Sequence, residues 1–133
     1  MCGIAGICNP VCNGKENMKK MLDRMQLRGP DAEGMWQDAA GKVFFGHRRL
    51  SIVDLSSCGS QPMSSHSGRY EICYNGEMYN YKEISDRLLK DGHVDKFNGT
   101  SDTEVLVESI EAYGIEETLK QCKGMFAFAL YDN

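Results

Sequence analysis

Apolar residues recur along this chain with two spacings, one typical of strands and one typical of helices. Residues 2–8 are apolar with two glycines, and they predict a short buried strand that ends at Asn9-Pro10. Asp38-Ala39-Ala40-Gly41 has the composition of a hairpin connection between two further strands. The other predicted strands lie at residues 35–37, 43–46, 50–53, 70–74 and 125–131.

Three segments have the spacing of amphipathic helices. Met18, Leu22 and Met25 fall on one face of the first helix, which should end at the breaker cluster 28–30. The other two helices begin at sequences that resemble capping boxes, namely Asn80-Tyr81-Lys82-Glu83 and Ser101-Asp102-Thr103-Glu104. This order of strands, helices and a last strand predicts a layered α+β fold. Since nothing follows the strand at 125–131 to pair with it, we expect residues 1–133 to be one domain that is incomplete at its C-terminus and poorly stable alone.

Composition and charge exclude several classes of protein. The chain has 133 residues, of which 41% are hydrophobic and 26% are charged, which is typical of one globular domain. A net charge of −4 with both signs mixed argues against nucleic-acid binding. No apolar run reaches the ~18 residues of a membrane span, and the start lacks the pattern of a secretory signal. We therefore expect a cytoplasmic protein that binds neither nucleic acid nor membrane.

The cysteines are expected to be reduced thiols, because the cytosol does not maintain disulfides. Cys8 and Cys12 have no second pair at metal-binding spacing, so no metal site is predicted. Cys2 differs because it follows Met1 directly, and removal of Met1 would leave a thiol and a free α-amine on one residue. An α-amine has a pKa of about 8, so part of it can accept a proton near neutral pH. This pairing is one known arrangement for covalent catalysis. For Cys2 alone, however, the favoured interpretation is a small buried residue at a strand start, and the case for catalysis depends on the motifs that follow.

Four other clusters allow both a structural and a chemical interpretation. Arg28-Gly29-Pro30-Asp31 is first of all a helix stop. Arg49 follows another arginine at a strand end, where it is either solvated or able to bind a carboxylate in bidentate fashion. Asn75-Gly76 predicts a turn, yet too few residues remain before Asn80 for a returning strand. The side-chain N–H of Asn75 and the backbone N–H of Gly76 can instead converge on an oxyanion. Asp102 either caps a helix or pairs with an ammonium group.

In this order, the motifs resemble the class II glutamine amidotransferase domain of glutamine-hydrolysing asparagine synthetases, over essentially the whole chain. Other class II amidotransferases, such as the glucosamine-phosphate and phosphoribosylamine enzymes, share the Cys-Gly start and the Asn-Gly pair but lack Arg-Leu-Ser-Ile followed by Gln-Pro. The motifs that carry the resemblance are Cys2-Gly3-Ile4-Ala5-Gly6, Arg28-Gly29-Pro30-Asp31, His47-Arg48-Arg49-Leu50-Ser51-Ile52-Val53-Asp54, Gln61-Pro62, Asn75-Gly76-Glu77-Met78-Tyr79-Asn80, Ser101-Asp102-Thr103-Glu104 and Gly124-Met125-Phe126-Ala127-Phe128-Ala129.

The resemblance implies an N-terminal-nucleophile hydrolase fold, an αββα sandwich. It also implies that Cys2 attacks the side-chain amide of L-glutamine, forms a γ-glutamyl thioester and releases ammonia. Arg49 would hold the α-carboxylate of glutamine, and Asn75-Gly76 would form the oxyanion hole. Glu77 and Asp102 would receive the α-ammonium group. The glutamine-binding residues given by the resemblance are Arg49, Leu50, Ser51, Ile52, Val53, Asn75, Gly76, Glu77 and Asp102.

The resemblance further implies a set of partners. In the full enzyme, ammonia passes to a C-terminal synthetase domain that amidates aspartate, and none of that domain is present in residues 1–133. ATP and Mg²⁺ are expected only there, so no cofactor and no metal are expected in this chain. The full enzyme is compatible with a homodimer. Two alternatives stay open: glutaminase chemistry that feeds another acceptor, such as a sugar acid in surface-polysaccharide synthesis, or a truncated fragment without catalysis.

Overall fold

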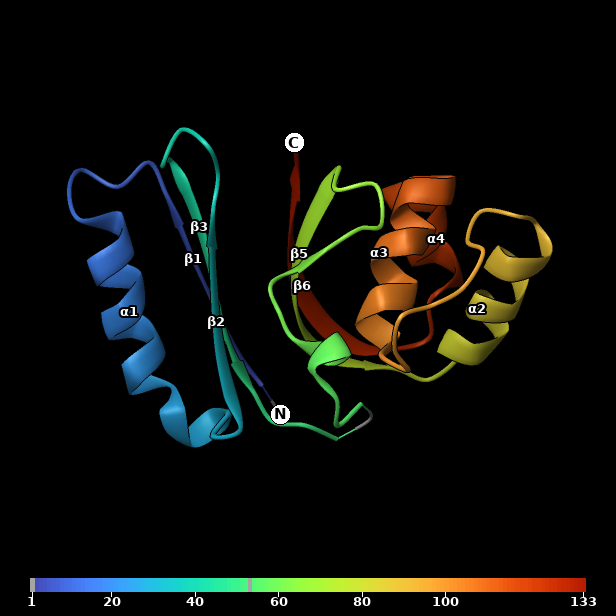
Figure 1. The fold of residues 1–133 in the computed structure, drawn as a ribbon, viewed down its shortest axis with the longest axis horizontal. Coiled ribbons are helices and arrows are strands. Elements are labelled where there is room, and N and C mark those ends of the chain that lie inside the picture. Colours follow the sequence, from blue (N-terminus) through green and yellow to red (C-terminus); the bar gives the residue numbers. More distant parts are fainter. Residues whose placement is uncertain (1, 53) are drawn as a thin grey trace.

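Two β-sheets stacked face to face form the middle of the molecule, and helices cover both outer faces (Figure 1). The computed structural model describes residues 2–52 and 54–133, and within them each sheet has three antiparallel strands. The layers run α, β, β, α, as predicted for an α+β sandwich. None of the helices in the described part of the chain combines the length and the apolar character needed to cross a bilayer.

The first sheet has the spatial order β1-β3-β2, and α1 covers its outer face. The bounds of these elements, with the short 3-10 helix η1, are β1 Gly3–Cys8, α1 Gly14–Arg24, η1 Gln26–Arg28, β2 Ala32–Gln37 and β3 Val43–Arg49. Met18 and Leu22 of α1 are fully buried, which confirms the helix predicted from their spacing. The helix lies close to the sheet because Gly46 has no side chain: a Cβ atom there would be 2.4 Å from the Met18 sulfur.

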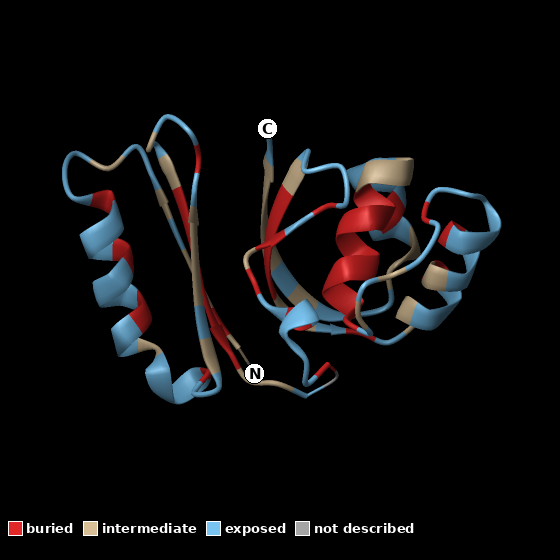
Figure 2. Ribbon diagram, in the orientation of Figure 1, coloured by how far each residue is buried: buried red, intermediate tan, exposed pale blue. Residues whose placement is uncertain are grey.

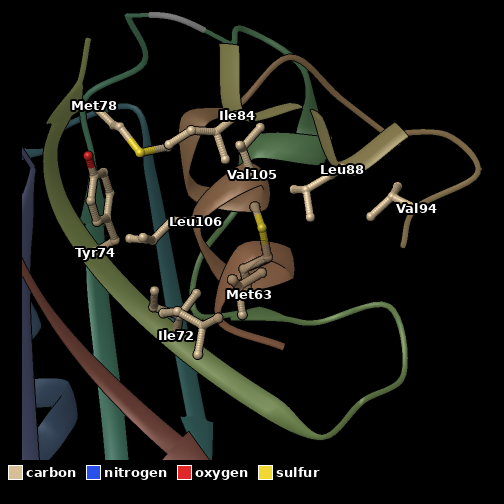
Figure 3. Close-up of a cluster of buried hydrophobic side chains, with 11 residues drawn as sticks. Met63, Ile72, Tyr74, Met78, Ile84, Leu88, Val94, Val105 and Leu106 are labelled. Carbon is tan, nitrogen blue, oxygen red and sulfur yellow. The ribbon is translucent and has the colours of Figure 1, made fainter. Parts of the chain in front are cut away.

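The second sheet has the spatial order β4-β5-β6, and α2, α3 and α4 lie on its outer side. The bounds of these elements, with the 3-10 helix η2, are η2 Ser57–Gly59, β4 Met63–Ser64, β5 Tyr70–Met78, α2 Tyr81–Lys90, α3 Asp102–Tyr113, α4 Ile115–Gln121 and β6 Gly124–Asp132. Helix α3 packs against β5 and is buried over most of its length (Figure 2). The main core is shared by the second sheet, α2 and α3 (Figure 3), and consists of Met63, Ile72, Tyr74, Met78, Ile84, Leu88, Val94, Val105, Leu106, Val107 and Ile110.

Hydrogen bonds connect the facing strands of the two sheets. His47 on β3 is 1% exposed, and its Nε2 lies 3.2 Å from the carbonyl oxygen of Tyr74 on β5. Burial lowers the pKa of His47 to about 4, so at neutral pH the uncharged ring donates one N–H to that carbonyl. The Cys73 thiol donates to the Gly46 carbonyl oxygen at 3.3 Å, and burial raises its pKa to about 12, which keeps the proton on sulfur. These two bonds fix β3 relative to β5.

The turn predicted at Asn75-Gly76 is wrong, because both residues lie inside β5. They pair with Ala127 and Phe126 of β6, in a strand that continues to Met78. A Cβ atom at residue 76 would be 2.4 Å from the Phe126 Cα. Glycine is therefore required here by the close approach of β6 and not by a turn.

Two further predictions about strands need correction. Residues 50–52 form a loop and not a strand, and Val53 lies outside the described residues. The last strand has a partner, since β6 pairs with β5 from Gly124 to Asp132. In the described part of the chain its other edge pairs with no strand. The expectation of an unpaired strand therefore applies to one edge only.

Only one of the two predicted capping boxes caps its helix. Ser101 accepts a hydrogen bond from the Thr103 N–H at 3.1 Å, as an N-cap side chain does. The Asn80 side chain instead donates to the Gln121 carbonyl oxygen at 3.0 Å and accepts from the Lys123 N–H at 2.8 Å. Asn80 therefore holds the connection between α4 and β6, because a short polar side chain can pair with more distant backbone as readily as with its own helix.

Candidate active site

A cavity of about 160 Å³ lies where the N-terminus, the loop after β3 and strand β5 come together. Figure 1 shows the N-terminal end of the chain beside that loop, between the two sheets. Val53 lies outside the described residues. All other predicted site residues line the cavity: Cys2, Arg49, Leu50, Ser51, Ile52, Asn75, Gly76, Glu77 and Asp102. The fold thus brings together four segments that are far apart in the sequence.

Cys2 is half-buried and stands directly before β1. Its sulfur accepts a hydrogen bond from the Leu50 N–H at 3.3 Å and lies 3.6 Å from the Leu50 carbonyl oxygen. The Arg28 Nε donates to the Cys2 carbonyl oxygen at 3.3 Å, which holds the backbone of the residue. The Leu50 backbone therefore holds the sulfur at the wall of the cavity, where a ligand can reach it.

The segment Arg28-Gly29-Pro30-Asp31, predicted as a helix stop, also supports the end of β3. A Cβ atom at Gly29 would be 2.2 Å from the carbonyl carbon of Arg48, so only glycine allows this close approach. The Asp31 N–H donates to the Arg49 carbonyl oxygen at 3.0 Å. The Asp31 Oδ2 accepts from the Ser51 N–H at 2.7 Å. The backbone around Arg49 is therefore held in place from outside the sheet.

Arg49 supplies positive charge to the cavity from the end of β3. The residue is 8% exposed, so its guanidinium is largely shielded from water. Nη1 donates to the Ser56 carbonyl oxygen at 2.7 Å, and Nη2 donates to the Asp54 carbonyl oxygen. Since a guanidinium carries five N–H groups, several remain for a carboxylate in the cavity.

Two acidic residues face the same cavity. Asp102, the first residue of α3, accepts hydrogen bonds on Oδ2 from the Tyr74 hydroxyl at 3.0 Å and the Met78 N–H at 2.9 Å. Figure 3 shows the Tyr74 hydroxyl directed toward the Met78 end of β5. Burial and the charge of Asp102 raise the pKa of Tyr74, so its hydroxyl remains a donor. Both bonds use Oδ2, which leaves Oδ1 for a ligand cation. Glu77 is exposed at the cavity wall.

Asn75 and Gly76 line the cavity together with Cys2. Among the described residues, the buried Asn75 Oδ1 has no hydrogen-bond partner. Leaving a buried amide unpaired costs about 1–3 kcal/mol, unless a ligand or water pairs with it. The unpaired amide oxygen of a cavity residue therefore indicates a place where a ligand can donate a hydrogen bond.

Sequence reasoning missed cavity residues that act through their neighbours. The Gln61 Oε1 accepts from the Tyr74 N–H at 2.6 Å, and its Nε2 donates to the Thr103 hydroxyl at 3.1 Å, so Gln61 joins β5 to α3. Asp54 supplies one of the carbonyl groups that hold the guanidinium of the site. The sequence signal for these residues was their place beside recognised motifs. Gln61 binds Tyr74, which directly precedes Asn75, and Asp54 is the last residue of the motif that contains Arg49.

Other ionisable groups pair with protein groups outside the cavity. His66 Nε2 lies 2.8 Å from Glu104 Oε1, and the His66 N–H donates to Glu108 at 2.7 Å, which ties a loop to α3. In the part of the chain that the structure describes, no three His, Cys, Asp or Glu side chains form a group that could hold a metal ion. Cys8 and Cys12 are exposed free thiols.

The whole chain, residues 1–133, matches the family model of a glutamine amidotransferase domain. The chain is 39% identical over 137 residues to glutamine-hydrolyzing asparagine synthetase 1 of Bacillus subtilis (strain 168), and the match covers 99% of this chain and 21% of that protein. It is 36% identical over 144 residues to amidase chry2 of Gibberella zeae, with the same shares covered, 99% and 21%. The solved structure of glutamine phosphoribosylpyrophosphate amidotransferase from B. subtilis superposes with a TM-score of 0.78 at 20% identity, over 97% of this chain and 35% of that chain.

These similarities differ in what they establish. The chain spans about 21% of the length of the two relatives, so it corresponds to one part of them. The structural neighbour is too distant in sequence to show more than the fold, which is the N-terminal-nucleophile αββα sandwich. The family model covers every residue, including the cysteine, arginine and acidic residues of the cavity. The chain therefore belongs to the family of glutamine amidotransferase domains.

Proposed function

We propose that this chain is the glutaminase part of a glutamine-hydrolysing amidotransferase of the asparagine synthetase type. The observation that carries the proposal is the meeting of Cys2, Arg49 and Asp102 at one cavity, from distant positions in the sequence. A free amino acid is a zwitterion, so its site needs a cation for the carboxylate and an anion for the ammonium group. Hydrolysis of its side-chain amide needs, in addition, a nucleophile within reach.

In the proposed complex, the guanidinium of Arg49 binds the α-carboxylate of L-glutamine, beside the backbone of residues 50–52. Asp102 receives the α-ammonium group through Oδ1, since its other oxygen is held by protein donors. Glu77 contributes a second negative charge at the cavity wall. With both ends of the amino acid bound, the side-chain amide extends toward Cys2.

The reaction then proceeds in two balanced steps. With Met1 removed, the α-amine of Cys2 takes the thiol proton, and the sulfur bonds to the side-chain carbonyl carbon of glutamine. Asn75 and the Gly76 N–H stabilise the negative charge on the carbonyl oxygen. The C–N bond breaks, ammonia leaves with the proton from the α-amine, and a γ-glutamyl thioester remains. Water attacks the thioester carbon, so glutamate is released and the thiol is restored.

The ammonia acceptor would bind outside residues 1–133, so its identity rests on the named relatives. The names of most similar relatives favour aspartate, amidated with ATP and Mg²⁺ in a synthetase domain outside residues 1–133. A relative named amidase chry2 matches equally over the chain, which favours a second candidate, the same glutaminase chemistry feeding another acceptor. We assign neither ATP nor a metal to these residues. The six free cysteines support a reducing compartment, and we propose the cytoplasm.

The test is replacement of the nucleophile in the full-length protein. Cys2→Ala should abolish glutamate release from glutamine and leave synthesis from added ammonia intact. Acid quenching of the wild type during turnover should trap a γ-glutamyl group on Cys2 that mass spectrometry locates. Cys8→Ala is the matched control, because Cys8 is an exposed thiol at the other end of β1 and should retain full activity. Glutamine hydrolysis that survives in Cys2→Ala would exclude the proposed mechanism.

A further inference from the structure

Asp54 is a buried carboxylate at the cavity wall, and both of its side-chain oxygens accept hydrogen bonds from protein groups. It is 7% exposed and stands in the loop after β3. Its Oδ1 accepts from the Ser56 N–H at 2.7 Å and the Ser56 hydroxyl at 2.6 Å. Its Oδ2 accepts from the Thr100 N–H at 2.8 Å. The Ser56 and Thr100 donors lower the pKa of Asp54 to about 2, so the group is a carboxylate at any pH at which the protein works.

The backbone of the same loop holds the guanidinium of Arg49. The carbonyl oxygens of Asp54 and Ser56 accept from its two terminal nitrogens. Gly59 also lies against this guanidinium, since a Cβ atom there would be 2.3 Å from Nη2 and 3.2 Å from the Asp54 Cβ. Arg49 and the loop are therefore packed as one unit. The side chain of Asp54 connects this unit to another segment of the chain through the hydrogen bond from Thr100.

The attachment point is the start of α3. Thr100 is followed by the N-cap Ser101 and then by Asp102, so the bond from Thr100 to Asp54 connects the arginine-binding loop to the acidic end of the cavity. The contact is close, since a Cβ atom at Gly99 would be 2.5 Å from the Asp54 Oδ2. Asp54 is thus a bridge between the segments that carry the two opposite charges of the site.

We propose that Asp54 is a positioning residue that sets the separation between the guanidinium of Arg49 and the carboxylate of Asp102. The site then selects ligands that carry a carboxylate and an ammonium group at the spacing of an α-amino acid. Asp54 does this without touching substrate. The inference rests on the proposed glutamine site and adds a residue that fixes its dimensions.

The test is Asp54→Asn in the full-length protein. Asparagine has the same size, but its NH₂ group cannot accept a hydrogen bond, so the N–H of Ser56 or of Thr100 loses its acceptor. We expect KM for glutamine to rise about tenfold to a hundredfold, as for the loss of a hydrogen bond to a charged group. We expect kcat to change by less than about threefold, because the nucleophile and the amide donors lie on other elements.

Two glutamine analogues distinguish positioning from a general structural defect. 4-Aminobutanamide lacks the α-carboxylate, and 5-amino-5-oxopentanoic acid lacks the α-ammonium group, so each engages one charged end of the site. Their competitive inhibition constants against glutamine should be the same in Asp54→Asn and wild type, to within about twofold. A comparable loss on both analogues would overturn the proposal, and so would a loss on one alone, since Asp54 would then act on a single end.

Asp38→Asn is the matched control. Asp38 is also 7% exposed and accepts two backbone N–H bonds, from Lys42 and Val43 at 2.7 Å each, but it does not line the cavity. It should lower stability without changing KM, and an equal rise in KM in this variant would overturn the proposal. Calorimetry with L-glutamine and Cys2→Ala, with and without Asp54→Asn, tests binding apart from catalysis. Binding without hydrolysis in the wild type would refute the proposed function alone, whereas binding that Asp54→Asn leaves unchanged would refute the inference alone.

Discussion

Arg48 and Arg49 are neighbours on β3, equally buried at 8% exposure, yet their side chains should serve different purposes. Successive side chains of a strand point to opposite faces. Arg49 lies at the cavity, as described above. Arg48 lies on the α1 side, where Nε donates to the Leu22 carbonyl oxygen at 2.9 Å and Nη2 pairs with Glu33. Replacing each arginine by alanine should therefore separate substrate binding from stability.

The expected magnitudes follow from the partners that each side chain leaves behind. Arg49→Ala removes the charge-assisted bonds to the α-carboxylate, worth about 1.5–3 kcal/mol, so kcat/KM for glutamine should fall about tenfold to a hundredfold. Arg48→Ala removes a charge-assisted bond to the Leu22 carbonyl oxygen, which still accepts from the Met25 N–H at 3.0 Å. The loss of that bond should lower the free energy of unfolding by about 1.5–3 kcal/mol. The lower half of that range is expected, because Glu33 keeps a second partner in Lys19 at 2.9 Å.

Steady-state glutaminase kinetics and urea unfolding at one temperature check both changes in the full-length protein. Arg49→Lys is a useful third variant: it keeps the charge but not the bidentate geometry, and it should fall between Arg49→Ala and wild type. Equal losses of kcat/KM for Arg48→Ala and Arg49→Ala, after correction for the folded fraction, would refute the assignment of the two faces.

Two further predictions concern the groups around the cavity. Tyr74→Phe leaves Asp102 with one donor fewer and should raise KM for glutamine about threefold to tenfold; inhibition by 5-amino-5-oxopentanoic acid, which has no ammonium group, should not change, and a parallel loss there would contradict the reasoning. His47→Gln should remove a pH dependence of stability, because a pKa of about 4 in the folded state against 6.5 when unfolded lets the unfolded chain take the proton first. Stability due to His47 is complete above about pH 6.5 and falls by up to about 3 kcal/mol toward pH 4; urea unfolding across this range should show a flatter curve for the variant, and an unchanged curve would count against the buried neutral ring.

Local sequence pattern correctly predicted those elements in which buried residues recur with the period of a helix or a strand. Met18 and Leu22 are one turn apart and both fully buried, so helical spacing alone located α1. The strands of the first hairpin were likewise found from the runs on either side of residues 38–41, although the predicted β2 began three residues late and the predicted β3 ended three residues early. Each of these segments packs against the core with one face, and the spacing of its apolar residues identifies that face.

Two of the failures, at Asn75-Gly76 and at Asn80, share a different cause, which is contact with a segment far along the chain. Asn75-Gly76 has the composition of a turn, but the glycine is required by the close approach of Phe126, about fifty positions further along the chain. Asn80 has the composition of a cap, but its side chain serves the backbone of Gln121 and Lys123. No local window contains these partners, so a local interpretation assigns the residue to the nearest role that its chemistry allows.

The candidate site was predictable to the extent that its residues belong to recognised motifs. Cys2 and Arg49 combine with Asp102 only through resemblance to a family, since nothing in their spacing says that they meet. Asp54 and Gln61 were missed as contributors because each acts through hydrogen bonds to other segments. A motif identifies the residues that touch a ligand more readily than those that hold them.

The stacking of the sheets determines whether the site can work at all. Cys2, the proposed nucleophile, precedes β1 in the first sheet, whereas Asn75 and Gly76, the proposed oxyanion donors, lie in the second. The distance between them is therefore a distance between layers. The hydrogen bond from His47 to the carbonyl oxygen of Tyr74 crosses from the first sheet to the second. Tyr74 directly precedes Asn75, so this bond lies next to the cavity residues of β5. An apolar contact at this point would tolerate sliding, because dispersion is weakly directional, whereas a buried hydrogen bond left unmade costs about 1–3 kcal/mol. A polar link next to Asn75 and Gly76 therefore fixes the registration of the two sheets at the point where the proposed mechanism needs it most.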